Sequence, residues 1–307
     1  AGIIKSYHKE SKIFFIGKSY TKSLIENCQY IDGFIDREQI ISGKTNLTQF
    51  NATFIIHVYP DKEIAKAAKN AGIPQRIGTS HRLFHWKYCN KRINLSRKSS
   101  DLHESQLNIK LLAPLGITRN FTLEEISEFT GFKKPEKTEN EKFKLIIHPK
   151  SKGSAREWLL ENYYQLVGLL PKNQFEIFIT GTREEGARIK AEHPDLLLEM
   201  GVTDLTGKLS LEQLIDEIGK CDALLACSTG PLHIAAASDI EAIGIYPPMR
   251  PLHPGRWAPI GKKVKVFAVD KNCIQCKKSN YCACVNSIAP ETIKNHLIEI
   301  AKKKRIT

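Results

Sequence analysis

The chain has 307 residues, of which 41% are hydrophobic, and this length favours two domains over a single core. Its formal net charge is +13, which suits an anionic partner such as nucleotide phosphates, a phosphorylated glycolipid, an acidic membrane surface or nucleic acid. No apolar run approaches the roughly 20 residues that span a bilayer, and the first residues lack the apolar core of a signal peptide. We therefore expect a cytoplasmic protein.

The first part of the chain alternates short apolar runs with amphipathic stretches. Strands are predicted at residues 12–17, 31–35 and 53–58, and helices at 19–28, 61–71 and 102–115, after the tail of a helix in 1–11. In the helix at 61–71, Ile64, Ala65 and Ala68 recur at helical spacing. Strands that alternate with helices predict a parallel α/β sheet.

Two further stretches of this part are polar. Residues 75–100 interleave seven Lys and Arg side chains with His81, His85, Trp86 and Tyr88, which predicts either an anion-binding surface or a solvated loop with anchored aromatic rings. The charged stretch 130–142 is punctuated by glycine and proline. We interpret it as a linker between a first domain at 1–132 and a second at 143–289.

The second domain repeats the alternation. Strands are predicted at residues 144–147, 175–180, 242–245 and 264–269, and helices at 158–170, 184–191, 210–218 and, as a C-terminal element in 290–307, at 290–302. Ser210 and Gln213 have the spacing of a capping box. The two domains share a βα design, as two Rossmann-like lobes would.

The stretch Leu224–Ala237, LLACSTGPLHIAAA, is predicted as strand, turn and helix. Cys227, Ser228, Thr229 and Gly230 form the turn, and Pro231 suits the first position of a helix. Free N–H groups and the helix dipole favour an anion there, typically a phosphate, and His233 lies close enough to face it. An ordinary strand-to-helix turn is the alternative.

Four of the eight cysteines cluster near the C-terminus. Cys273, Cys276, Cys282 and Cys284 have the spacing C-x2-C-x5-C-x-C, which predicts a tetrahedral zinc or iron site. A redox-labile disulfide pair and reduced surface cysteines are the alternatives. A metal here would be a structural clip before the last helix, because no further ligand position is evident.

Several segments together resemble one family. They are His148-Pro149 with the basic loop to Arg156-Glu157-Trp158, Leu205-Thr206-Gly207 with Ser210-Leu211-Glu212, Ser228 to His233, and Pro247-Pro248 with Trp257 to Gly261. Their order and spacing are similar to those of the ADP-heptose:lipopolysaccharide heptosyltransferases, glycosyltransferase family 9. Leu102-His103-Glu104 to Leu115-Gly116 is the most similar part of the first domain.

The resemblance implies an α/β GT-B fold, two Rossmann-like lobes with parallel sheets and a cleft between them. The first lobe would bind the lipid A–core acceptor, and the second the nucleotide-sugar. Donor-binding residues would be Ser151, Arg156, Glu212, Ser228, Thr229, Gly230 and His233. Thr229 and Gly230 would hold the diphosphate, Glu212 would accept from the ribose hydroxyls, and Ser151 and Arg156 would lie on the phosphate side.

The implied reaction is inverting heptosyl transfer from ADP-heptose to the lipopolysaccharide inner core, with no cofactor and no catalytic metal. The family often has Asp at Ser228 and Lys at Arg156, which would change the donor contacts. Members usually open with a strand and a Gly-Asp loop whose aspartate is the general base. None of the 19 glycines here precedes an aspartate. We therefore expect the first βα unit to be absent and transfer by this polypeptide to be poor.

The catalytic and acceptor-binding residues stay unassigned. Asp101, His103 and Glu104 are candidate substitute bases, although helix-surface or capping roles suit them better. The expected acceptor is an anionic glycolipid at the inner membrane surface, where the protein could bind peripherally. The alternatives are a GT-B transferase with another nucleotide-sugar donor, or an inactive nucleotide- or glycolipid-binding homologue. Nucleic-acid binding is suggested by charge alone and no motif supports it.

Overall fold

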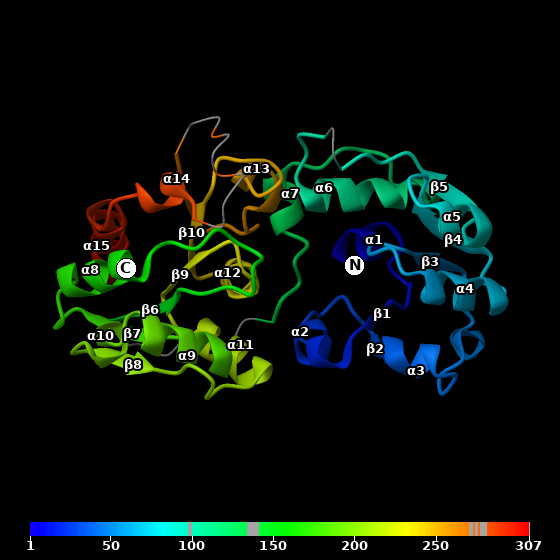
Figure 1. Cartoon of the computed structure of the whole chain (residues 1–307). Coiled ribbons are helices and arrows are strands. Elements are labelled where there is room, and N and C mark those ends of the chain that lie inside the picture. Colours follow the sequence, from blue (N-terminus) through cyan, green and yellow to red (C-terminus); the bar gives the residue numbers. More distant parts are fainter. Residues whose placement is uncertain (98–99, 134–140, 270–272, 274–275, 277–280, 307) are drawn as a thin grey trace. The chain divides into compact units, whose positions relative to one another are not determined.

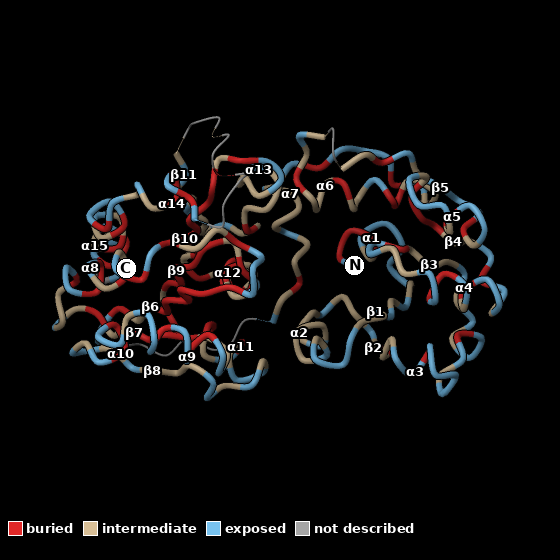
Figure 2. The backbone as a smooth tube through the Cα atoms, viewed as in Figure 1, coloured by how far each residue is buried: buried red, intermediate tan, exposed pale blue. Residues whose placement is uncertain are grey.

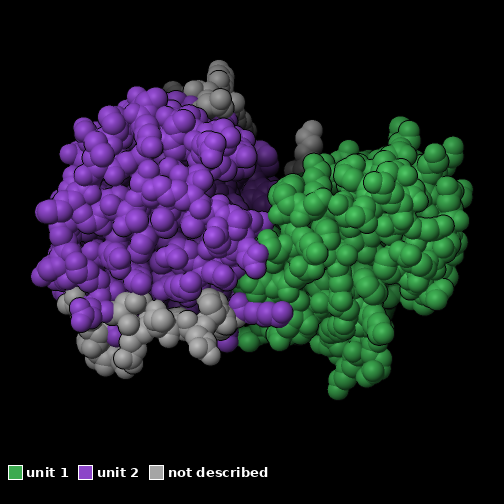
Figure 3. Space-filling view, turned by 90° about the horizontal axis from the view of Figure 1, so that it is seen from below, with its two compact units in different colours: residues 1–132 green, residues 133–307 purple. Residues whose placement is uncertain are grey.

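A computed structural model describes residues 1–307 except 98–99, 134–140, 270–272, 274–275, 277–280 and 307. The chain forms two compact units, unit 1 at residues 1–132 and unit 2 at residues 133–307 (Figures 1 and 3). Most of the linker predicted at 130–142 lies outside the described residues. No helix in the described ranges is both long and apolar enough to cross a bilayer.

Unit 1 contains five short strands: β1 (Phe14–Gly17), β2 (Gly33–Asp36), β3 (Phe54–Ile56), β4 (Gln75–Thr79) and β5 (Lys91–Ile93). Its α-helices are α1 (Gly2–Tyr7), α2 (Lys22–Glu26), α3 (Arg37–Ile41), α4 (Lys62–Asn70), α5 (Leu83–Tyr88), α6 (Glu104–Ile109) and α7 (Leu123–Ser127). Three 3-10 helices are η1 (Ser19–Thr21), η2 (Leu47–Phe50) and η3 (Lys110–Leu115).

These strands form two separate parallel sheets, β1-β2 and β3-β4-β5. One apolar cluster nevertheless runs under both, because Ile16 of β1 and Ile55 of β3 pack with Ile64 of α4. On the opposite face, Phe54 and Ile56 of β3 pack in the cluster that holds α1. The two sheets therefore share their cores while β1 and β3 are not hydrogen-bonded to each other.

The interpretation of residues 75–100 as a loop is wrong, because this stretch holds β4, α5 and β5. The strand was hidden since β4, QRIGT, has one large apolar residue, the fully buried Ile77. Its neighbour Arg76 ties this strand to the segments beside it. The guanidinium donates to the backbone carbonyls of Tyr88, at 2.8 Å, and of Ile73.

Unit 2 contains the strands β6 (Phe143–His148), β7 (Phe175–Ile179), β8 (Val202–Asp204), β9 (Ala223–Cys227), β10 (Glu241–Tyr246) and β11 (Val264–Ala268). Its helices are α8 (Leu160–Leu169), α9 (Arg183–Glu192), α10 (Asp195–Leu198), α11 (Leu211–Lys220), α12 (Gly230–Ala237), α13 (Pro254–Trp257), α14 (Ala283–Asn286) and α15 (Pro290–Ile306). The predicted strands and longer helices of this part are confirmed to within a few residues.

The strands of unit 2 form one parallel sheet in the order β11-β10-β9-β6-β7-β8. Its centre is the deepest part of the molecule, since every residue of β9 is buried (Figure 2). Helices α8 and α15 pack in the cluster on one face, with Ile147 and Leu225 of the sheet. Helix α12 lies on the other face, where a Cβ added at Gly244 would meet the side chain of Leu232.

The order of the strands reverses once. From β6 the chain moves outward through β7 to β8, and it then returns to β9 on the opposite side of β6 before it continues to β10 and β11. The carboxyl ends of β6 and β9 are therefore neighbours at a topological switch point. In open parallel sheets this is where ligands bind.

Candidate functional site

The candidate site lies at the carboxyl edge of the unit 2 sheet. Strands β6 and β9 pair in parallel from Leu145 opposite Ala223 to His148 opposite Ala226. The loop at residues 149–159 follows β6, and the turn at 228–229 follows β9, so these two segments leave the sheet side by side. The loop contains the predicted Ser151 and Arg156, and the turn contains Ser228 and Thr229.

Thr229 has an arrangement that an ordinary helix cap lacks. It is the N-cap of α12 with extended backbone, yet its side chain makes no capping hydrogen bond. Its Oγ1 is buried and has no hydrogen-bond partner among the described residues. A Cβ added at the exposed Gly230 would meet no atom within 4 Å. A hydroxyl without a described partner and open space at Gly230 thus coincide with the positive end of a helix dipole, which suits an anion.

Two other predicted residues adjoin this helix start. Ser228 hydrogen-bonds to the hydroxyl of Tyr246, which itself donates to the carbonyl of Trp257 at 2.7 Å. Burial raises the pKa of Tyr246, so this hydroxyl stays neutral. His233 is half-buried on α12, within its first turn. The structure therefore brings Ser228, Thr229, Gly230 and His233 together, as their sequence proximity requires.

Ser151 is buried, and its hydrogen-bond donors bind the carboxylate of Glu157. Its backbone N–H and its hydroxyl both donate to Glu157, at 2.8 and 3.0 Å. Arg188 also reaches Glu157, at 3.3 Å, and the ammonium of Lys150 lies 3.5 Å from the same carboxylate. Lys150 is only 5% exposed and also pairs with Glu192. Lys150 therefore places a buried positive charge next to the switch point, and the sequence did not predict a role for it.

His148, the last residue of β6, is buried behind this loop. Its Nδ1 lies 3.0 Å from the hydroxyl of Thr180, and its Nε2 lies 3.9 Å from the carboxylate of Glu185. Burial lowers the pKa of His148, and the acidic neighbours oppose that shift only in part. We therefore interpret His148 as a neutral residue that orders the end of the strand.

The other two predicted residues lie further apart. Arg156 is half-buried, and its Nη2 donates to the backbone carbonyl of Cys276 at 3.4 Å. Glu212 is exposed in the first turn of α11, whose N-cap Ser210 forms the predicted capping box with Gln213. Helix α11 packs against α12, and because α11 begins after the carboxyl end of β8, its first turn, with Glu212, lies towards the same edge of the sheet as Thr229.

The four clustered cysteines converge behind Arg156. Cys276 Sγ lies 3.2 Å from Cys273 Sγ and 2.9 Å from Cys282 Sγ. The Sγ atoms of Cys273, Cys276 and Cys284 all lie within 4.8 Å of one another. Cys276 and Cys282 are 1% and 0% exposed, and the described residues contain no disulfide bond.

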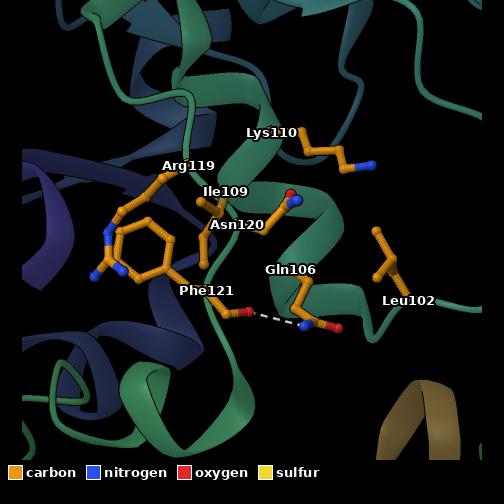
Figure 4. A pocket seen from close by; sticks show the side chains of 7 residues that line it. All are labelled: Leu102, Gln106, Ile109, Lys110, Arg119, Asn120 and Phe121. Atoms are coloured by element: carbon orange, nitrogen blue, oxygen red, sulfur yellow. Dashed lines mark hydrogen bonds between the residues drawn. The ribbon is translucent and has the colours of Figure 1, made fainter.

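In unit 1 two of the three candidate bases, His103 and Glu104, have structural roles, and the third, Asp101, is exposed. His103 is the N-cap of α6 in a capping box, and Glu104 pairs with Arg97 at 2.6 Å. Figure 4 shows a small pocket nearby, lined by Leu102, Gln106, Ile109, Lys110, Arg119, Asn120 and Phe121. Gln106 donates to the carbonyl of Phe121 at 2.8 Å across it. None of the predicted donor-binding residues lines this pocket.

Comparisons with known proteins agree with this geometry. A model of glycosyltransferase family 9 (heptosyltransferase) matches residues 64–284. A "Putative glycosyltransferase" of Haemophilus influenzae is 27% identical over 300 residues, which cover 89% of this chain and 83% of the relative. The lipopolysaccharide core heptosyltransferase OpsX of the same species is 26% identical over 123 residues, 40% of this chain and 35% of that protein.

Solved structures share the fold at low sequence identity. E. coli ADP-heptose lps heptosyltransferase II superposes with a TM-score of 0.74 and 16% identity, covering 98% of this chain and 93% of that one. A family 9 glycosyl transferase from Veillonella parvula gives a TM-score of 0.74 at 18% identity, covering 98% and 91%. The expected GT-B class, with two Rossmann-like α/β units, is confirmed.

Proposed function

This chain belongs to glycosyltransferase family 9, the heptosyltransferase family, and from that premise we propose that it transfers a heptosyl group from ADP-heptose to the lipopolysaccharide inner core. Membership makes it a glycosyltransferase. The finer proposal draws on the names of relatives, which include a lipopolysaccharide core heptosyltransferase and an ADP-heptose heptosyltransferase.

One observation carries the donor site. The buried hydroxyl of Thr229 lacks a hydrogen-bond partner among the described residues and lies at the N-terminus of α12, next to the switch point. A diphosphate placed there would accept from this hydroxyl and from the N–H of Gly230. Ser228 and His233 would flank it, and the exposed Glu212 on the neighbouring helix would accept from the ribose hydroxyls.

The loop after β6 would complete the site on the phosphate side. Ser151 and Lys150 are both held by Glu157, which orders this loop, and the charge of Lys150 is already paired there. Arg156 adds a second positive side chain from the same loop. Departure of ADP leaves negative charge on the diphosphate, and prearranged N–H groups and cations stabilise that charge. In this proposal the chemistry is metal-independent, and the four cysteines take no part in it.

In the proposed reaction, the acceptor hydroxyl oxygen bonds to the anomeric carbon while the bond from that carbon to the diphosphate oxygen breaks. Attack from the face opposite ADP inverts the configuration. The acceptor would be an anionic glycolipid at the inner membrane surface, and the net charge of +13 favours such a surface. A cytoplasmic, peripheral location follows from that proposal.

Thermal unfolding with ADP, UDP, GDP and CMP in turn tests the donor. A nucleotide at about a hundredfold its dissociation constant should stabilise the native state by roughly 2.7 kcal/mol. We expect stabilisation with ADP alone. Stabilisation by UDP or GDP instead would mean a different nucleotide-sugar donor. No stabilisation by any of them would contradict a functional donor site.

Thr229→Val tests the site within the same assay. It removes the hydroxyl and keeps the shape, so the ADP-induced stabilisation should fall strongly while unfolding without ligand changes little. Thr203→Val is the matched control, because Thr203 is exposed on the edge strand β8. Adding His233→Ala to Thr229→Val should abolish ADP binding. Unchanged ADP affinity in that double variant would contradict the assignment.

A further inference from the structure

We propose that Cys273, Cys276, Cys282 and Cys284 bind one metal ion, zinc or iron, as four thiolates, and that this ion clips the C-terminal segment onto the loop that follows β6. The four residues come from a stretch of twelve positions, yet their side chains gather at one point. The site lies outside the proposed transfer chemistry, so its existence does not depend on the proposed function.

The distances suit a single ion. Zinc–thiolate bonds of about 2.3 Å in a tetrahedron separate the sulfur atoms by about 3.8 Å. Cys276 Sγ lies 3.2 and 2.9 Å from the Sγ atoms of Cys273 and Cys282, and Cys284 Sγ lies within 4.8 Å of those of Cys273 and Cys276. Three of the sulfur atoms therefore lie close enough for one ion, and Cys282 Sγ, which contacts Cys276 Sγ, must move towards Cys273 and Cys284 to complete the tetrahedron.

The burial of the cluster argues for a bound ion as well. Cys276, Cys282 and Cys284 belong to the main core cluster of unit 2, and Cys273 packs against it. Buried single cysteines behave as small apolar side chains and disperse through a core, as Cys89 and Cys221 do here. Three that lie within 4.8 Å of one another, with a fourth against Cys276 and all four at metal-ligand spacing, indicate a common ligand.

The surroundings of the cluster provide the outer contacts that metal sites use. Arg156 donates to the backbone carbonyl of Cys276, so a positive side chain contacts the backbone of one ligand of a site whose four thiolates would exceed the charge of a divalent ion. Trp158 Nε1 donates to the carbonyl of Ile288 at 3.1 Å, and Leu159 N–H donates to Asn286 Oδ1 at 2.9 Å. Through these contacts the cysteine segment and α14 hold the end of the loop at 149–159.

Binding is a simple exchange of protons for metal. Each of the four thiols loses its proton to water, and the sulfur lone pairs form four bonds to the ion with no change of oxidation state. The ion would then fix the backbone at Cys276 and thereby the guanidinium of Arg156. The proposal that the ion fixes Arg156 for phosphate binding rests on the proposed function, in which Arg156 lies on the phosphate side. The metal site itself does not.

The test measures metal in the purified full chain by mass spectrometry of the elements. We expect one zinc or iron per chain, and iron would also give visible thiolate-to-metal absorption. Removal of the ion and titration with Co²⁺ should give the visible spectrum of a tetrahedral thiolate site. Metal far below one per chain, together with no such cobalt spectrum, overturns the proposal.

Two variants and one labelling measurement complete the test. Cys276→Ser should lose the metal, whereas Cys89→Ser, which removes a buried thiol of unit 1, should keep it. If Cys276→Ser fails to fold, thiol alkylation of the wild type replaces it: the four cysteines should react together and only after chelation. Alkylation that is indifferent to chelator, or an intact mass lower by the hydrogens of disulfides, overturns the proposal.

Nucleotide binding then separates the two proposals. Chelated wild type should bind ADP severalfold more weakly than the metal-loaded protein, because Arg156 loses its fixed neighbour. A full metal complement with no ADP binding in either form would contradict the proposed function and leave the metal site standing. ADP binding by a chain that takes up no metal would contradict the metal site and leave the proposed function standing.

Discussion

Both units consist of parallel strands that alternate with helices, but the described strands form one continuous sheet in unit 2 and two separate sheets in unit 1. In unit 2, β6 and β9 each pair on both edges, and β9 is buried along its whole length. In unit 1, β1 pairs only with β2 and β3 only with β4 among the described residues, and Phe14 and Phe15 of β1 are each 41% exposed. A continuous sheet gives a rigid edge for a site, whereas a divided one leaves backbone groups unpaired by the sheet.

The comparison also explains where the strongest candidate site lies. Thr229 and the loop at 149–159 begin at strands whose positions are fixed from both sides. In unit 1 the helix α4, which follows β3, is capped by the side chain of Asp61, whereas Thr229, among the described residues, leaves its hydroxyl unused at the start of α12. The site therefore coincides with the more completely paired sheet.

The largest expected difference between the units is in core packing. Ile147→Ala removes a fully buried side chain from β6 and should lower the free energy of unfolding by about 4 kcal/mol. Ile55→Ala, at a half-buried position of β3, should cost about 2 kcal/mol. Hydrogen exchange of the core amides in each unit measures both effects. Equal losses would contradict the contrast between the two sheets.

Acid should weaken unit 1 through His57. Burial, with His85 beside it, lowers the pKa of His57 to about 4. The unfolded chain, with an ordinary histidine pKa near 6.5, then binds more protons than the folded chain between these two values. The stability from neutral His57 is therefore complete above about pH 6.5 and is lost as the pH falls towards 4, by roughly 3 kcal/mol.

Denaturant unfolding at pH 7 and pH 4.5 checks this effect. His57→Gln should reduce the pH dependence by the part that His57 contributes, whereas His81→Gln, at an exposed position, should leave it unchanged. The same pH dependence in His57→Gln as in the wild type would contradict the assignment to this residue.

The smallest expected effects concern helix caps, where the units should not differ. Ser210 caps α11 in unit 2, and Thr122 caps α7 in unit 1, each in a capping box. Ser210→Ala and Thr122→Ala should each cost about 1 kcal/mol, because local hydrogen bonds do not depend on sheet continuity. A much larger loss in one unit, measured by denaturant unfolding, would show that the cap there also supports tertiary packing.

The sequence predicts unit 2 better than unit 1 for a physical reason. Strands such as β6 and β9 are runs of apolar residues, because a central parallel strand is buried on both faces. The strand β4 could not be recognised, since its neighbours in sequence are basic and its register depends on contacts from distant segments. Similarly, Pro114 and Gly116 end the predicted helix at 102–115 as a 3-10 turn.

The candidate site also has one part that the sequence predicts and one part that it does not. The residues Ser228 to His233 were predictable because they lie on one continuous strand-turn-helix. The burial of Lys150 and the contact of Arg156 with Cys276 were not, since they follow from tertiary packing between separate segments. The convergence of the cysteines was predictable from spacing, but their attachment to the loop at 149–159 was not.

The most direct test of the account is hydrogen exchange of the full chain with and without ADP, read by mass spectrometry of peptides. The account predicts slower exchange in peptides that cover residues 149–159 and 228–236, and no change around the unit 1 pocket at Leu102 to Phe121. Thr229→Val should lose that protection and Thr203→Val should keep it. Protection confined to the unit 1 pocket, or an identical pattern in Thr229→Val and the wild type, would contradict a nucleotide site at the junction of β6 and β9.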